Sequence, residues 1–109
     1  MNDAFHDRER GFERKFELDQ ELAFKVKARR DRLFGLWVAA QLGKDGDTAD
    51  TYAGEVIRKN FDHPGDADML DKVRADLRAG QVRVTEPDLL KQLRLAEMRA
   101  RREILGPEM

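Results

Sequence analysis

The stretch from Leu22 to Leu42 limits most strongly what this chain can fold into, because it carries the longest uninterrupted helical pattern in the sequence. Its apolar residues form two adjoining stripes at spacings of three and four residues or their sums, which is typical of a helix contacted from two sides. One stripe consists of Leu22, Val26, Leu33, Trp37 and Ala40, and the other of Phe24, Ala28, Gly35, Ala39 and Leu42. We therefore predict a central helix with Trp37 buried in the middle of the fold and Gly35 where a neighbouring backbone or ring comes close.

Three further helices are predicted from caps and apolar spacing. They cover about residues 47–60, 66–79 and 85–105, and the expected N-cap residues are Asp47, then Asp66 or Asp68, and Thr85. The short apolar stretch at residues 82–84 is predicted to be a loop, because no second strand is available to pair with it. Charged residues make up 39% of the chain and aromatic residues 7%, which suits solvated amphipathic helices better than strands.

These features predict an all-α protein in two parts. Residues 19–109 are expected to form a small four-helix bundle, and residues 1–18 an N-terminal segment that is mobile or partly helical. The predicted core of the bundle includes Leu33, Trp37, Tyr52 and Val56.

The N-terminal segment is highly charged, yet it holds three of the six phenylalanines. Phe5, Phe12 and Phe16 are seven and four residues apart, so on a helix they lie within roughly 40° of one another and form a narrow aromatic seam. The seam could pack on the bundle, or it could be the face with which a helix binds a partner protein. Gly11 lowers the intrinsic helicity of the segment and favours the second interpretation, a tail that becomes ordered on binding.

The sequence contains no constellation for catalysis or metal binding. There is no cysteine, and the two histidines, His6 and His63, lack metal-ligand spacing. We therefore expect no enzyme activity, no metal and no tightly bound cofactor. The charged N-terminus does not look like a signal peptide and no apolar stretch is long enough to span a bilayer, so we expect a cytoplasmic protein.

Basic residues cluster in the first half of the central helix, where Lys25, Arg29 and Arg30 could contact phosphate or a partner. Alternatively, these cations pair with the acidic stretch that follows Lys44. The residues alone leave two other functions open: a helical adaptor or nucleic-acid-associated regulatory protein, and a bundle that binds ATP or ADP weakly. A DNA-reading bundle would normally show a strongly basic face on a separate recognition helix, and the net charge here is slightly negative, at −1, so we expect no nucleic-acid partner.

The order of several residues resembles a known family. These are Phe5, Asp7-Arg8-Glu9-Arg10-Gly11-Phe12-Glu13, Phe16, Phe24-Lys25, Ala28-Arg29-Arg30, Leu33, Gly35-Leu36-Trp37, Ala39, Leu42-Gly43 and Tyr52-Ala53. With them the chain resembles the zeta subunit of alphaproteobacterial F-type ATP synthases over about residues 5–57.

The resemblance implies a small helical inhibitor of ATP hydrolysis whose N-terminal segment enters the catalytic head of the synthase. The implied partners are the catalytic and non-catalytic subunits and the rotor, so any contact with the inner membrane would be indirect. The residues that would carry inhibition are Phe5, Arg8, Glu9, Arg10, Phe12, Glu13 and Phe16.

Overall fold

The computed structural model describes the backbone of residues 2–63 and 65–106 and the side chains of residues 19–63 and 65–106. In these residues the chain forms four α-helices and no strand. They are α1 (Asn2–Gln41), α2 (Gly46–Phe61), α3 (Ala67–Ala79) and α4 (Glu86–Leu105). The predicted all-α bundle is confirmed, and residues 82–84 lie in a loop as expected.

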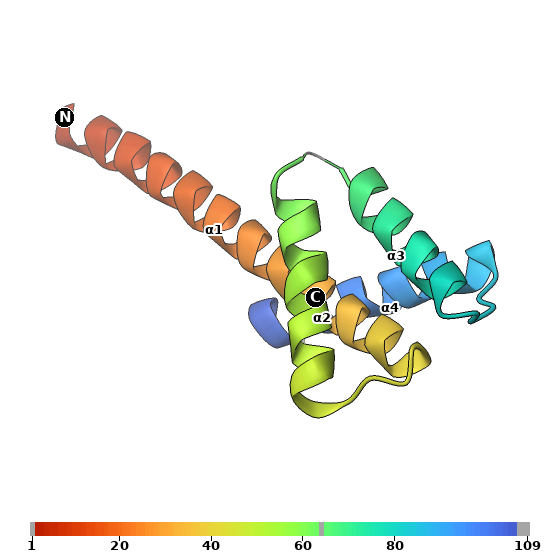
Figure 1. Ribbon diagram of the computed structural model, residues 1–109. Helices are drawn as coiled ribbons and strands as arrows, with labels where there is room; N and C mark the ends of the chain where they lie inside the picture. Colours follow the sequence, from red (N-terminus) through yellow and green to blue (C-terminus); the bar gives the residue numbers. More distant parts are fainter. Residues whose placement is uncertain (1, 64, 107–109) are drawn as a thin grey trace.

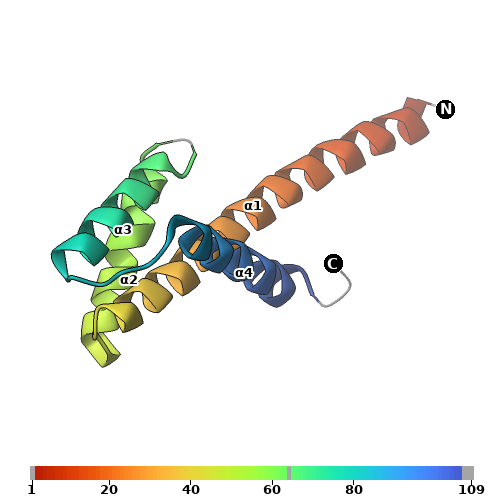
Figure 2. The same ribbon diagram turned by 90° about the vertical axis from the view of Figure 1, so that its right-hand side faces the viewer.

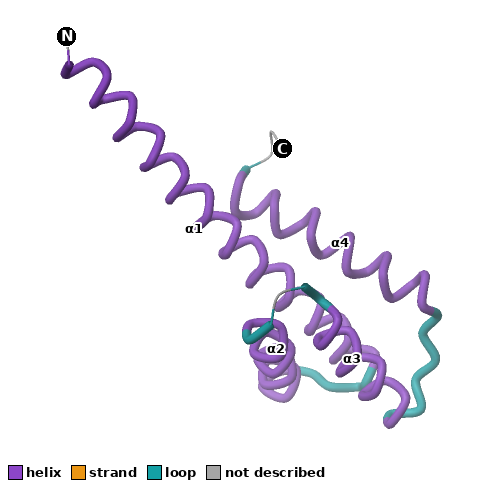
Figure 3. Tube along the Cα trace, turned by 90° about the horizontal axis from the view of Figure 1, so that it is seen from above, coloured by secondary structure: helices purple, strands orange, loops and turns teal. Residues whose placement is uncertain are grey.

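The longest helix, α1, is the spine of the molecule (Figure 1). Its C-terminal half packs against the other three helices: α2 crosses it steeply, and α4 runs beside it in the opposite direction (Figure 3). Helix α3 lies antiparallel to α2 (Figures 1 and 2). The molecule measures 67 × 28 × 28 Å along its principal axes, and the forty residues of α1, which span about 60 Å, account for the longest of these dimensions. The molecule is therefore a small helical body on a long helical rod.

The core lies where α2, α3 and α4 converge on α1. Phe34 and Val38 of α1 are fully buried there. The other buried members of this cluster are Ala39, Ala49, Tyr52, Val56, Met69, Val73, Leu77, Leu89 and Ala96.

The prediction that Trp37 lies in the middle of the core is wrong. Trp37 is only partly buried, as is Leu33, and its ring stacks on that of Phe34 with centroids 6.4 Å apart. At about 100° per residue, Phe34 and Val38 lie between the two apolar stripes. Because Phe34 and Val38 are fully buried members of the core cluster, the centre of the core lies in the direction between the stripes, and Trp37, which belongs to one stripe, lies to one side.

Gly35 marks the crossing of α1 and α2, as predicted. A Cβ atom at Gly35 would lie 2.9 Å from the Cα atom of Ala53, which is closer than such atoms approach in real structures. The absence of a side chain at Gly35 therefore allows the two helix backbones to touch.

The N-cap predictions are confirmed at two of three helices. Thr85 caps α4, since its hydroxyl accepts a hydrogen bond from the backbone N–H of Asp88 at 3.2 Å, and Asp66 is the N-cap residue of α3. Asp47 is not the N-cap residue of α2, because the helix begins earlier: the N–H of Ala49 donates to the carbonyl of Asp45, the observed N-cap residue. Asp47 lies in the first turn, where its carboxylate still complements the helix dipole.

In the part of the chain that the structure describes, no helix combines the length and the apolar character needed to cross a membrane.

Candidate functional site

The N-terminal half of α1 extends away from the other three helices (Figures 1 and 2). The helix is continuous from Asn2 onwards, across Gly11 and across the predicted domain boundary after residue 18. The residues predicted to bind a partner all belong to this part of α1, and their side chains are not among those that the structure describes. They are Phe5, Arg8, Glu9, Arg10, Phe12, Glu13 and Phe16.

At the foot of this projecting helix, Arg30 joins α1 to its neighbours. Its Nη2 atom lies 2.7 Å from Oδ1 of Asp66, the N-cap residue of α3, and its Nε atom lies 3.0 Å from Oδ1 of Asp31. Glu97 of α4 is 3.8 Å from the same guanidinium group. Only 13% of the Arg30 side chain is exposed. This arginine therefore stabilises the position of α1 relative to α3 and α4.

Asn60 completes the network from α2. It is 1% exposed and donates from Nδ2 to Asp31 at 2.9 Å and to Asp66 at 3.0 Å. Its Oδ1 atom is buried and has no partner among the described residues. Sequence reasoning missed Asn60, although its position four residues after the buried Val56 is a signal that could have revealed it.

The two carboxylates of this network are shifted in opposite directions. Burial raises the pKa of Asp31, and the hydrogen bond from Asn60 and the charge of Arg30 offset only part of the effect. Burial also acts on Asp66, but there the hydrogen bonds from Arg30 and Asn60 outweigh it and lower the pKa. Asp31 therefore opposes folding when it is ionised, whereas Asp66 favours folding when it is ionised.

The other basic residues of α1 whose side chains the structure describes also meet acidic or polar partners within the chain. Lys25 lies 3.6 Å from Glu21, and Arg29 lies 3.5 Å from Glu103 of α4. Lys27 donates to the backbone carbonyl of Asn60, and Arg32 lies 3.1 Å from Asp50. The predicted phosphate or partner contacts Lys25, Arg29 and Arg30 are thus not brought together into one site. The first two remain about half exposed.

Tyr52 and Val56, predicted as core residues, are buried in α2. The Tyr52 hydroxyl donates to Oδ2 of Asp76 at 2.8 Å, and Lys72 lies over the ring, 5.2 Å from its centroid. Burial and the nearby carboxylate of Asp76 raise the pKa of Tyr52, so the hydroxyl stays protonated and links α2 to α3.

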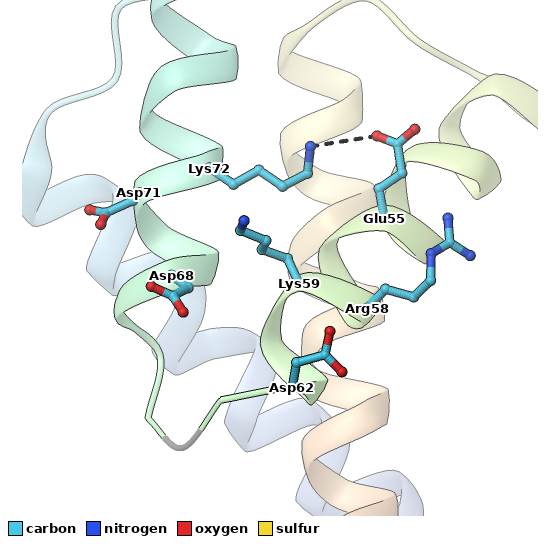
Figure 4. Close-up of a pocket in the computed structure, with 7 residues that line it drawn as sticks. All are labelled: Glu55, Arg58, Lys59, Asp62, Asp68, Asp71 and Lys72. Carbon is cyan, nitrogen blue, oxygen red and sulfur yellow. Dashed lines mark ion pairs between the residues drawn. The ribbon is translucent and has the colours of Figure 1, made fainter.

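An open polar groove lies between α2 and α3 (Figure 4). Lys59 and Lys72 point into it, and Nζ of Lys72 lies 3.5 Å from Glu55. The complete lining is Glu55, Arg58, Lys59, Asp62, Asp68, Asp71 and Lys72. Carboxylates outnumber cations in this set, so an anionic ligand such as a nucleotide would meet repulsion as well as attraction here. Weak ATP or ADP binding stays a prediction.

Comparison with protein families identifies a match over residues 1–103 to the model described as ATPase inhibitor subunit zeta. The chain belongs to the ATPase inhibitor subunit zeta family. The match spans both the projecting part of α1 and the helical body, up to the last turn of α4. A search of curated proteins finds no match. Membership of the zeta family confirms the resemblance stated from the sequence, and it makes the chain a member of an inhibitor family rather than an enzyme family.

Proposed function

We propose that this zeta-family protein inhibits ATP hydrolysis by the F-type ATP synthase by inserting the projecting part of α1 into the catalytic head, where it blocks rotation. The observation that carries the proposal is that α1 continues far beyond the helices that pack on it (Figure 1). A helix that extends from a packed body is free to enter a groove of another protein, a common mode of peptide recognition.

The helical body would then act as the anchor. Its buried apolar residues, from Val26 to Ala100, are supplied by the C-terminal half of α1 and by the other three helices. This core is extensive without residues 1–18. The partners of the proposal are the catalytic and non-catalytic subunits and the rotor of the synthase, which would place the protein in the cytoplasm and at the inner membrane only through the synthase.

The aromatic seam would provide the binding energy of the inserted helix. A buried phenylalanine contributes about 1.5–3 kcal/mol, and interface energy is concentrated in a few such anchors. Phe12→Ala or Phe16→Ala should therefore weaken inhibition about tenfold or more, which corresponds to about 1.4 kcal/mol. Arg14→Ala is the matched control, because Arg14 is two residues from both phenylalanines and lies on the opposite side of the helix.

The direct test is to titrate the purified variants into the isolated catalytic head while it hydrolyses ATP. A variant without residues 2–17 should lose inhibition but keep its helicity and its cooperative thermal unfolding. Undiminished inhibition by the truncated protein would refute the proposed role of the segment. Loss of cooperative unfolding on truncation would show instead that the seam belongs to the core.

A further inference from the structure

Two aromatic rings are left largely exposed at the foot of the projecting helix. Phe24 of α1 is 55% exposed, and Phe61, the last residue of α2, is 64% exposed. The rings meet edge to face with centroids 5.7 Å apart. They border a hollow of about 250 Å³, which is lined by Phe24, Lys27, Ala28, Asp31, Ile57 and Phe61. We call these six residues the aromatic hollow.

The exposure of Phe24 was not expected from the sequence, where it belongs to a stripe of predicted core residues. Helix α2 ends at Phe61, and the chain then turns away towards α3, which packs on another side of α2 (Figure 1). The two rings therefore cover each other only in part. Exposed phenylalanines around a concave apolar site are typical of the anchor points of protein interfaces.

We propose that the aromatic hollow is a second docking point for the catalytic head of the synthase and that it receives an apolar side chain of the head. The inference rests on the proposed function, because it is the inserted helix that brings the head to this place. Phe24 lies 22 residues after Asn2 on the same continuous helix, which is about 33 Å along its axis. A groove of the catalytic head that encloses α1 as far as the helical body would therefore also contact the hollow.

The continuity of α1 also gives the second contact an energetic advantage. No flexible linker separates Phe24 from the inserted segment, so both contacts are held in one rigid geometry. Binding at the hollow then requires little additional ordering once the helix is inserted.

Charge indicates the chemistry of the surface that would cover the hollow. Lys27 is the cation that lines the hollow, whereas Lys25 is not part of the lining and lies 3.6 Å from Glu21. Asp31 also lines it, but it is 2% exposed and already accepts hydrogen bonds from Arg30 and Asn60. Of the two charged residues that line the hollow, Lys27 is therefore the more accessible one, and the matching surface is an apolar side chain with a carboxylate beside it.

The test compares Phe61→Ala and Phe24→Ala with Met98→Ala. Met98 is an equally suitable truncation control, since it is a large apolar side chain that is 62% exposed, but it lies on α4. We expect each phenylalanine variant to raise the Kd for the isolated catalytic head about tenfold, while saturating protein still inhibits hydrolysis fully. Met98→Ala should leave the Kd within about twofold, and the melting temperatures of the variants should stay near that of the unchanged protein because all three side chains are exposed.

Ala28→Leu tests whether binding depends on the concave shape of the hollow or only on the amount of exposed apolar surface. The larger side chain should fill the hollow from its own wall and raise the Kd, although it adds apolar area. If Phe61→Ala lowers the stability of the protein, Ala28→Leu still tests whether the hollow is a docking point.

The outcomes distinguish this inference from the proposed function. If Phe61→Ala and Ala28→Leu bind as tightly as the unchanged protein, the aromatic hollow is not a docking point, although inhibition that depends on residues 2–17 would stand. Equal weakening by Phe61→Ala and Met98→Ala would also overturn the inference, because it would show no preference for the hollow. If removing residues 2–17 leaves inhibition unchanged, the proposed function fails whatever the hollow does.

Discussion

Replacing Gly35 by alanine should destabilise the protein although alanine is the better helix former. Gly35 lies at the crossing of α1 and α2, where a new Cβ atom would be 2.9 Å from the Cα atom of Ala53 and 3.2 Å from Cβ of Val56. Gly54, within α2, offers a matched control. A Cβ atom there would have only the flexible end of Arg58 nearby, at 3.9 Å.

The expected magnitudes follow from two opposing terms. In both helices alanine gains about 1 kcal/mol over glycine in intrinsic helix propensity. Carbon atoms prefer separations of about 3.5–4.0 Å, so at Gly35 the backbone of α2 would have to move by about 0.6–1.1 Å. Overpacking of this kind costs about 1–3 kcal/mol. Gly54→Ala should therefore raise the free energy of unfolding by about 1 kcal/mol, and Gly35→Ala should lower it by up to about 2 kcal/mol.

Urea unfolding followed by circular dichroism and by fluorescence measures both variants. Trp37 is the only tryptophan and stacks on the buried Phe34, so its emission reports on the packing of the core. If Gly35→Ala proves as stabilising as Gly54→Ala, the two backbones do not meet at Gly35 and the crossing described above is wrong.

Three further predictions concern the core and the polar network. Phe34→Ala should lower the free energy of unfolding by about 3–5 kcal/mol and Trp37→Ala by only about 1–3 kcal/mol, as measured by urea unfolding; equal losses would contradict the placement of Trp37 at the side of the core. The pKa of Asp66 is lowered from an ordinary value of 3.8. The ionised carboxylate therefore stabilises the fold above pH 3.8, and this stabilisation is lost as the pH falls through the folded-state pKa. In a plot of the free energy of unfolding against pH, Asp66→Asn should remove this loss on the acid side. The pKa of Asp31 is raised from 3.8, so its contribution to the free energy of unfolding falls as the pH rises from about 3.8 through the folded-state pKa. Asp31→Asn should remove that fall. A pH profile of stability unchanged by either substitution would refute the assigned directions of the two pKa shifts.

Local features of the helices could be predicted because short-range chemistry determines them. The cap at Thr85 depends on a hydroxyl three residues before an N–H group, which the sequence places directly. Gly35 was identified because a glycine inside a strong helical pattern is costly unless a neighbour needs the space. The alternative that basic residues of the central helix pair with the acidic stretch is confirmed for Arg30, which contacts Asp66, but not for Lys25 and Arg29, which lie beside Glu21 and Glu103.

The candidate site was only partly predictable. The seam of Phe5, Phe12 and Phe16 is predicted from helical spacing, whereas the role in inhibition that we propose for it came from the family resemblance. The network around Asn60 was missed, because an asparagine near a helix end is more often a surface residue, and only the meeting of α1, α2 and α3 makes it buried.

The sequence by itself determined approximately where the helices lie, how α3 and α4 are capped and which residues of each helix form apolar stripes. Periodicity defines directions around the axis of a single helix, but it does not say which direction the other helices share. Only the tertiary structure decided that Phe34 and Val38 form the centre of the core and that Trp37 lies beside it. It also decided that Phe24 stays exposed, because α2 ends beside it and no described helix covers the ring. These outcomes depend on contacts between residues far apart in the chain, and local spacing carries no information about them.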